Sequence, residues 1–353
     1  MTDRAESGLA APAPTPRSSS VVLRDCFICC NHRNVLDVTA TVLPLPTLLV
    51  EPDPESPISG TGKPKPELRE RLRKIPTFHN VVNAVVLYAV TIAVFVVTAM
   101  SHNVFVWIAA FFVMGPIHAR FAIFMHEAAH RLLFANRKAN DFVGKWFIAF
   151  PAFVPIDLYR RGHMAHHREE FGPNEPDIPL YRGYPIPRDS FWRKLRRDAL
   201  GITGWKLTKG LFRGVTAPDA KVRGQARGIV AAQLVILAIC TAFGYPGLYF
   251  ALWFLPHLTV WRVINRLRGI AEHGGMKQSA DRRETTHSVR QHLLARMTIV
   301  PYYTGWHLAH HVDSGIPMRN LPRLHRELER AGYIQPGLEY RSYPALWKAL
   351  ASG

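Results

Sequence analysis

Cysteine is scarce in this chain of 353 residues, which contains only four. Cys26, Cys29 and Cys30 lie together near the N-terminus, and Cys240 lies inside an apolar run. This distribution excludes a disulfide-stapled fold and indicates a reducing compartment. The three clustered cysteines and His32 could bind a metal, but no second cysteine pair at zinc-site spacing accompanies them. Their role therefore stays open.

Acidic residues are also in deficit. Asp and Glu number 26 against 44 Lys and Arg, which gives a formal net charge of +18. Such an excess favours an acidic partner, a nucleic acid or an anionic membrane surface. The basic stretches flank long apolar runs, as the cytoplasmic loops of membrane proteins do. We therefore predict a membrane protein with no nucleic-acid partner.

The N-terminus lacks the apolar core of a secretory signal. Residues 2–20 are rich in Ala, Pro and Ser, and residues 51–66 form a stretch rich in Pro, Glu and Gly that is typical of a linker. We therefore predict that residues 1–66 are disordered or loosely ordered. Residues 67–353 are then expected to form the folded domain.

Four long apolar runs dominate that domain. They cover Val81–Met100, Val104 to about Met125, Ile229–Phe243 and Leu248–Ile264. A helix needs about 20 apolar residues to cross the hydrocarbon core of a bilayer. The runs therefore predict an all-α, multi-pass membrane protein with two transmembrane helical hairpins, rather than a soluble protein with buried core helices. A fifth stretch, Phe142–Ile156, is broken by Pro151 and Pro155 and is too short and irregular to span, although it could lie in the membrane interface.

Lysine and arginine crowd three regions: before the first hairpin, between the hairpins and after the second. The turns within the hairpins carry none. The positive-inside rule then predicts that both termini and the long middle loop face the cytoplasm. The basic charge of the middle loop predicts either attraction to anionic lipid or docking of an acidic partner.

Histidine is abundant, with 17 residues, and nine of them fall in four compact groups. The groups are His126 and His130; His163, His166 and His167; His273; and His307, His310 and His311. Residues three and four apart share one face of an α-helix, so each larger group can close on a metal without distorting its helix. All four groups lie at the cytoplasmic ends of predicted spans or in cytoplasmic regions. We expect them to meet in a cytoplasmic helical cap beneath the membrane.

Imidazole nitrogen is a good ligand for iron, zinc, copper and nickel, and one such metal takes at most about six ligands. Nine histidines therefore imply more than one ion. The first group also matches the zinc metalloprotease pattern His-Glu-x-x-His, in which Glu127 would act as general base. A membrane zinc protease would leave both His-x-x-His-His groups and His273 without a role. A metal-handling membrane protein that is not an enzyme is the remaining alternative.

The four groups resemble the histidine boxes of the membrane fatty acid desaturase and alkane hydroxylase superfamily. The resemblance runs from about Pro76 to His311 and includes two hairpins, the order of the boxes and their spacing. It implies that nine histidines hold two iron ions (Fe2+/Fe3+). By position these are His126, His130, His163, His166, His167, His273, His307, His310 and His311. In several members an Asn stands four residues before the third-box histidine; here that position is Gly269, and Asn265 lies one turn earlier.

The resemblance also implies an enzyme that uses O2 and an external electron donor to attack a C–H bond of a fatty acyl or lipid chain. The His-x-x-His-His boxes are similar to those of desaturases, and hydroxylation is the alternative because Glu272-His273-Gly is similar to a box of alkane hydroxylases. A ferredoxin-, rubredoxin- or cytochrome b5-like donor is expected, since the chain shows no flavin, haem or iron–sulfur motif. Glu127 and Glu272 are expected to accept N–H bonds from ligating imidazoles, and Asp177 is a further candidate for that role.

Overall fold

The computed structural model describes residues 42–173 and 175–353. Within these ranges the chain is almost entirely helical, which confirms the predicted all-α class. The one sheet found there pairs two short parallel strands, β1 (Ser288–Val289) and β2 (Glu339–Tyr340). The cluster of three cysteines lies outside the described residues.

The first two long helices form a hairpin. α2 spans Thr77–Met100 and α3 spans Val104–Ala129, and the Asn103 side chain caps α3 by accepting the Phe105 N–H at 2.8 Å. α2 begins before the predicted start, and α3 continues past the predicted end to include the first histidine group. Large apolar side chains are exposed along α2. A protein surrounded by water would not leave such a continuous apolar surface exposed.

The second hairpin is less regular. Its elements are α9 (Ala220–Ala242), α10 (Pro246–Leu248), the π-helical η5 (Tyr249–Phe254), α11 (Leu255–Leu258) and α12 (Val260–His273). The returning helix therefore reaches well beyond the predicted end and places the third histidine group on its last residue. A break falls at Thr259, where φ is −119° and ψ is −85°.

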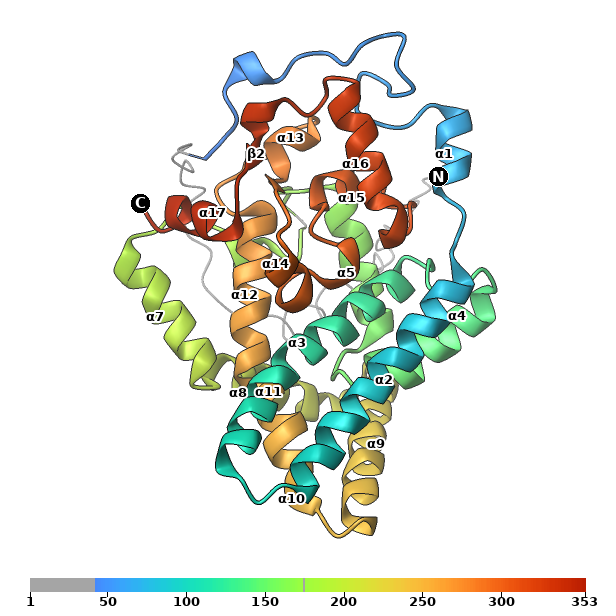
Figure 1. Ribbon diagram of the computed structural model, residues 1–353, viewed down its shortest axis with the longest axis vertical. Coiled ribbons are helices and arrows are strands. Elements are labelled where there is room, and N and C mark those ends of the chain that lie inside the picture. Colours follow the sequence, from blue (N-terminus) through green and yellow to red (C-terminus); the bar gives the residue numbers. More distant parts are fainter. Residues whose placement is uncertain (1–41, 174) are drawn as a thin grey trace, which may run out of the picture. The chain divides into compact units, whose positions relative to one another are not determined.

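Four segments are long and apolar enough to cross a membrane, which confirms the multi-pass class. They are Pro66–Met100, Val104–Ala129, Ala220–Ala242 and Pro246–His273. Both hairpin turns lie at one end of this part of the chain, and shorter helices form a cap at the other end (Figure 1).

The shorter helices connect the spans and build the cap. They are η2 (Pro46–Leu48), α1 (Pro66–Leu72), α4 (Arg137–Val143), the π-helical η3 (Gly144–Ala149), α5 (Ile156–Arg168), α6 (Ile178–Tyr181), α7 (Arg188–Ala199), α8 (Ile202–Arg213), η4 (Gly214–Thr216), α13 (Arg282–Thr285), α14 (Leu293–Thr298), η6 (Pro301–Tyr303), α15 (His307–Val312), η7 (Met318–Asn320), α16 (Leu321–Arg330), η8 (Pro336–Leu338) and α17 (Tyr343–Leu350). As predicted, the stretch containing α4 and η3 does not form a span.

α3 is the central helix, packed against α2, α12, α5 and η3. Two glycines allow this close packing. A Cβ added at Gly115 would lie 2.3 Å from Val260 Cγ1 of α12, and a Cβ added at Gly144 would lie 2.5 Å from Ala128 Cβ of α3. The absence of a side chain at these positions brings α12 and η3 against α3, which carries the first histidine group at its end.

Residues 42–65 precede the predicted boundary at residue 66 and pack against the C-terminal part of the cap. Ile58 is 1% exposed, and Asp53 donates its backbone N–H to Ala331 O at 2.8 Å. Arg283 Nη1 donates to Val50 O at 2.7 Å. The division of the chain at residue 66 stays a prediction.

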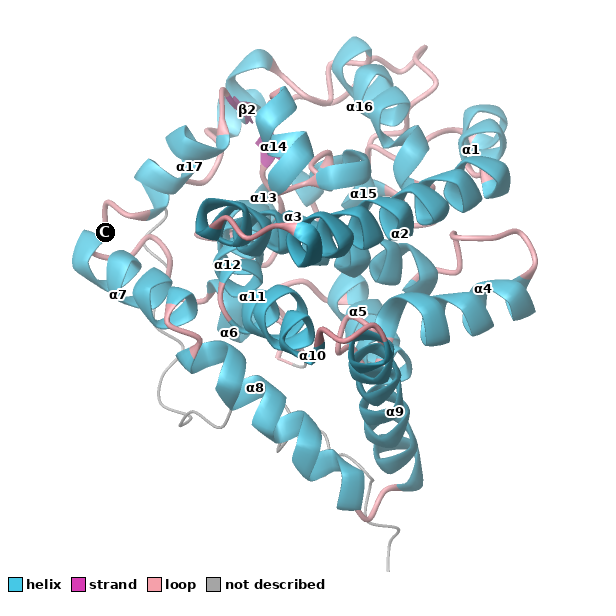
Figure 2. Ribbon diagram, turned by 60° about the horizontal axis from the view of Figure 1, so that its bottom comes forward, coloured by secondary structure: helices cyan, strands magenta, loops and turns pink. Residues whose placement is uncertain are grey.

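α7 and α8 run along one side of the helical bundle (Figure 2). Trp192 of α7 and Trp205 and Phe212 of α8 are exposed, and so are Lys206 and Lys209. Exposed aromatic and basic side chains on one helix are typical of a segment that lies in the membrane interface. Because α7 and α8 lie in the basic middle loop, much of that loop is helical.

Candidate metal centre

The nine clustered histidines come from four separate elements. α3 carries His126 and has His130 as its C-cap, and α12 ends at His273. α5 carries the second group and α15 the fourth. Figure 1 shows these four elements near one another in the cap, and short distances between the rings join all nine imidazoles into one continuous cluster.

Five of the imidazoles form group A, which consists of His126, His130, His163, His167 and His310. Their potential ligand atoms all lie within 4.8 Å of one another. His163 Nε2 lies 2.9 Å from His130 Nε2 and 3.1 Å from His167 Nε2. His310 Nε2 lies 3.0 Å from His167 Nε2. The rings of group A therefore point their Nε2 atoms towards one another.

The other four imidazoles form group B, which consists of His166, His273, His307 and His311. His307 Nε2 lies 3.2 Å from His273 Nε2 and 3.0 Å from His311 Nε2. The ring centroids of His166 and His311 are 4.9 Å apart. Groups A and B adjoin each other, since the ring centroids of His167 and His311 are separated by 4.4 Å.

Hydrogen bonds between the rings do not account for this arrangement. An imidazole nitrogen carries one proton or one lone pair in the ring plane, so His163 Nε2 cannot bond properly with two other Nε2 atoms. The same holds for His307 Nε2 in group B. Within the described part of the chain, both ring nitrogens of His126 are buried without a hydrogen-bond partner.

Metal cations fit the donor set. An imidazole nitrogen bound about 2.1 Å from a metal places a second ligand at a right angle about 3.0 Å away. The separations between Nε2 atoms in groups A and B, 2.9–3.2 Å, match that value. Burial, followed by the neighbouring imidazoles, holds the pKa of His163, His310 and His311 well below the ordinary range. These rings stay neutral near pH 7 and keep a lone pair for a metal.

A sequence model described as fatty acid desaturase matches residues 101–344, which include all four histidine groups. The chain belongs to the fatty acid desaturase family. The resemblance expected from the histidine boxes is thereby confirmed. One curated relative is the dihydrorhizobitoxine desaturase of Bradyrhizobium elkanii, which is 25% identical over 242 residues. That match covers 64% of this chain and 69% of the relative.

Glu175 holds one ring of group B in this desaturase-family chain. His166 Nδ1 lies 2.5 Å from Glu175 Oε1, and the same carboxylate accepts the Tyr181 hydroxyl and the Phe171 N–H. Burial raises the pKa of Glu175, against the hydrogen bond from His166. Burial lowers the pKa of His166, but the bond to Glu175 and the neighbouring carboxylates raise it by more. Glu175 thus fixes the outer nitrogen of His166 as a donor and leaves Nε2 for the centre.

Glu170 does the same for a second ring of group B. Its Oε1 accepts His311 Nδ1–H and is also paired with Arg282 Nη1. Arg282 Nη2 in turn donates to His167 O at 3.0 Å. This ion pair ties α13 to the end of α5 and orients His311 from outside the cluster.

Of the remaining two rings of group B, His273 has a hydrogen-bond acceptor at its outer nitrogen and His307 has a carboxylate nearby. His273 Nδ1 lies 2.9 Å from Thr285 O, and His307 Nδ1 lies 3.4 Å from Glu272 Oε1. Glu272 is also paired with Arg268 at 2.6 Å. The histidine near Glu272 is thus His307 of the fourth box rather than the adjacent His273, and the predicted role of Glu272 stays a prediction.

Glu127 and Asp177 have different surroundings from those expected. Glu127 Oε1 accepts the Met318 N–H at 3.0 Å, and no hydrogen bond joins it to a histidine within the described residues. Asp177 is the N-cap of α6 and has no side-chain hydrogen bond to a histidine there.

A Cβ added at Gly269, one turn before the third-box histidine, would meet no atom within 4 Å. The helix face beside His273 is therefore open at that position.

Proposed function

We propose that this protein is a membrane di-iron enzyme that uses O2 and electrons from an external donor to desaturate a fatty acyl or lipid chain. Membership of the fatty acid desaturase family and the two adjoining groups of buried imidazoles support this proposal. Two bound iron ions would supply O2 activation and removal of hydrogen from an unactivated C–H bond.

The protein residues hold and shield that chemistry. The nine histidines surround two adjoining positions, while Glu170, Glu175 and Thr285 O hold the outer nitrogens of three rings of group B and Glu272 lies near that of the fourth. Seven of the nine histidines are buried and the other two, His130 and His167, are partly buried, which keeps bulk water away from the reacting atoms. The protein thus contributes position and a dry environment, whereas the redox chemistry belongs to the metals.

Desaturation is favoured over hydroxylation because the relative in Bradyrhizobium elkanii is named as a desaturase. Two electrons per turnover must come from outside the chain, from a ferredoxin-, rubredoxin- or cytochrome b5-like donor. The lipid-facing α2 and the basic α7–α8 segment suit a protein whose substrate is a membrane lipid and whose donor is acidic.

In the zinc protease alternative, Glu127 would have to act as the general base. A general base must reach a metal-bound water, whereas the Glu127 carboxylate faces the Met318 N–H. Metal analysis of the purified protein separates the two functions. We expect about two irons per chain, as in a two-metal site, and a single zinc per chain would contradict the di-iron proposal.

The decisive experiment is lipid mass spectrometry of a host with and without expression of the protein. We expect a new acyl species with one additional double bond, which disappears with His166→Ala. His102→Ala is the matched control, because His102 is exposed at the hairpin turn and belongs to neither group. A hydroxylated product would assign the alternative reaction, and an unchanged lipid profile at normal iron content would contradict both.

We further propose that both termini and the metal centre face the cytoplasm. The hairpin turns carry no Lys or Arg, whereas the regions at the other end of the spans are rich in both. Single cysteines placed at Asn103 and Gly244 should react with an impermeant reagent from outside, and a cysteine at Lys65 should not. Labelling at Lys65 from outside would contradict this orientation.

A further inference from the structure

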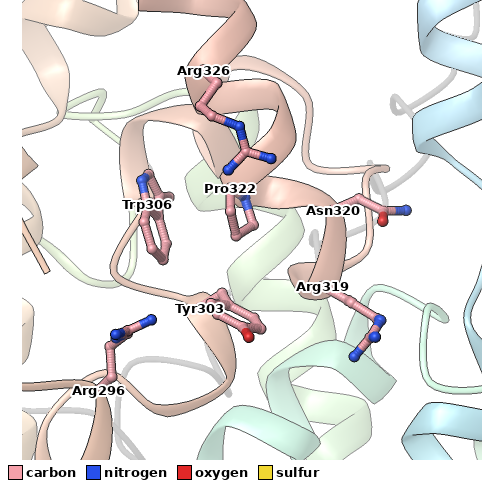
Figure 3. A pocket seen from close by; sticks show the side chains of 7 residues that line it. All are labelled: Arg296, Tyr303, Trp306, Arg319, Asn320, Pro322 and Arg326. Atoms are coloured by element: carbon pink, nitrogen blue, oxygen red, sulfur yellow. The ribbon is translucent and has the colours of Figure 1, made fainter. Parts of the chain in front are cut away.

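A cavity of about 490 Å³ lies in the cap next to the fourth histidine box. Its lining includes Arg296, Arg319, Arg326, Tyr303, Trp306 and Pro322. These residues come from α14, η6, η7, α16 and the residue before α15. Figure 3 shows the three guanidinium groups on different sides of the cavity, around the two aromatic rings.

The positive charge of this pocket has no partner among the described residues. Arg296, Arg319 and Arg326 make no ion pair or side-chain hydrogen bond there, and Arg296 Nε is buried without an acceptor. Arg319 and Arg326 are exposed and Arg296 is partly buried, whereas Arg69 and Arg73 of the cap are paired with Asp313. Three unpaired guanidinium groups facing one cavity form a site for an anion.

The chemistry favours phosphate over carboxylate. A guanidinium group offers five N–H donors in a fixed fork, and three forks need more acceptor oxygens than the two of one carboxylate. A phosphate group provides more oxygens and is a preferred partner of arginine clusters. Tyr303 and Trp306 add amphipathic rings of the kind found at the level of lipid head groups.

The surroundings of the pocket point to a lipid as the source of that phosphate. α14 is outside the four candidate spans, yet Leu293, Leu294 and Met297 are 65%, 71% and 51% exposed. α14 also contacts the spanning helix α3. Exposed apolar side chains beside a span are accommodated in the bilayer, which sets Arg296 of the same helix at head-group level.

The pocket is also close to the metal centre. Trp306 lines the cavity and directly precedes His307 of group B. Tyr302, next to Tyr303 of the lining, packs edge-on against Phe124 at a centroid distance of 4.6 Å, and Phe124 is two residues before His126 of the first box. A head group in this pocket therefore lies beside two elements that carry histidine boxes, α15 and α3.

We infer that this pocket binds the phosphate head group of a membrane phospholipid whose acyl chain is the substrate. The inference rests on the proposed function and deepens it, because it assigns the carrier of the acyl chain. Arg296, Arg319 and Arg326 bind the phosphate, and Tyr303 and Trp306 contact the glycerol region.

The test is a binding titration of the purified, metal-loaded full chain in neutral detergent. The probe is dihexanoylphosphatidylglycerol, with dihexanoylglycerol, inorganic phosphate and coenzyme A as comparison ligands. The Arg319→Gln/Arg326→Gln double variant should weaken lipid binding at least about ten-fold, because hydrogen bonds to charged groups are lost. Arg323→Gln is the matched control, since Arg323 is exposed on α16 and does not line the cavity.

Equal lipid affinity in all three proteins would overturn the inference, and so would equally tight binding of dihexanoylglycerol. Tighter binding of coenzyme A or phosphate than of the lipid would also overturn it, because the pocket would then serve a soluble anion. Binding needs no turnover, so failure of the proposed reaction leaves this measurement intact. In turnover assays with phospholipid, the double variant should raise KM and keep kcat, with normal iron content.

Discussion

The two histidine groups differ in burial and in support, since all four rings of group B are buried, whereas His130 and His167 of group A are only partly buried. Three rings of group B have a hydrogen-bond acceptor at the outer nitrogen, supplied by Glu170, Glu175 or Thr285 O, and Glu272 Oε1 lies 3.4 Å from that of His307. The hydrogen bonds of group A within the described residues run only between Nε2 atoms, and His126 has none. The protein therefore fixes the ring orientation and the tautomer of three group B histidines, whereas the orientation of the group A rings depends on helix packing and on the metal itself.

The largest effect is expected from two neighbours on α15 that belong to different groups. His310→Ala removes a donor of group A, and His311→Ala removes one of group B. Both should abolish activity, and each should lower the iron content from about two towards one per chain. Metal analysis after desalting is the measurement, with His102→Ala as control. Full activity in either variant would refute the site.

A smaller effect is expected from the carboxylates that support group B. Glu170→Gln and Glu175→Gln remove a negative charge from the outer nitrogens of His311 and His166. Loss of such partners typically weakens metal affinity about 10–100-fold, so a chelator should extract one iron early and the other late. Glu169→Gln is the matched control. Equal loss of both irons would show that groups A and B are not distinct in this way.

The contact between the helices that carry the two groups depends on Gly115. Gly115→Ala should destabilise the protein by about 1–3 kcal/mol, because the new Cβ overlaps Val260. Gly269→Ala is the control on α12, where nothing lies within 4 Å, and it should stabilise by about 0.5–1 kcal/mol through helix propensity. Thermal unfolding in detergent is the measurement. Similar shifts for both substitutions would contradict the role of this close approach.

The smallest effect concerns acid. Burial raises the pKa of Glu339, but hydrogen bonds from His325 and Arg290 outweigh it and leave the pKa below its ordinary value of 4.5. A carboxyl with a lowered folded pKa stabilises the protein above pH 4.5, and that contribution is lost as pH falls through the folded value. Arg290 is exposed, so we expect only about 1 kcal/mol.

This effect should reach group B first. Glu339 begins β2, which pairs with β1, and β1 follows Thr285, the partner of His273. Wild-type protein should therefore lose thermal stability below pH 4.5 more steeply than Glu339→Gln. If the thermal stability of the two proteins fell equally with pH, Glu339 would not be the cause of the acid sensitivity.

The sequence predicted the class of fold and the nine converging histidines because both depend on local patterns. Long apolar runs predict spans, and spacings of three and four residues predict shared helix faces. Span ends were less accurate: α12 continues to His273 because its last turns are amphipathic and pack inside the cap rather than in lipid.

The supporting carboxylates could not be predicted from proximity in the sequence. Glu127 is next to a histidine, but consecutive residues on a helix point about 100° apart, and this carboxylate faces Met318. Glu170 acts on His311 from a distant element, and its position three residues after His167 was the only available signal. Thr285 contributes its backbone carbonyl, and because every residue has one, the sequence gives no signal for this role.

The exposed aromatic residues of α8 have a mechanical consequence for the bilayer. A helix that crosses a bilayer passes through both leaflets, whereas the exposed Trp205 and Phe212 of a helix lying in the interface would insert into only one. Such an insertion adds area to one monolayer and not to the other, and therefore creates a difference in lateral pressure between them. Acyl chains with fewer double bonds pack more tightly, and a bilayer made of them resists this insertion. If the protein introduces double bonds as proposed, it would thus be more firmly seated in the membranes that it has already modified.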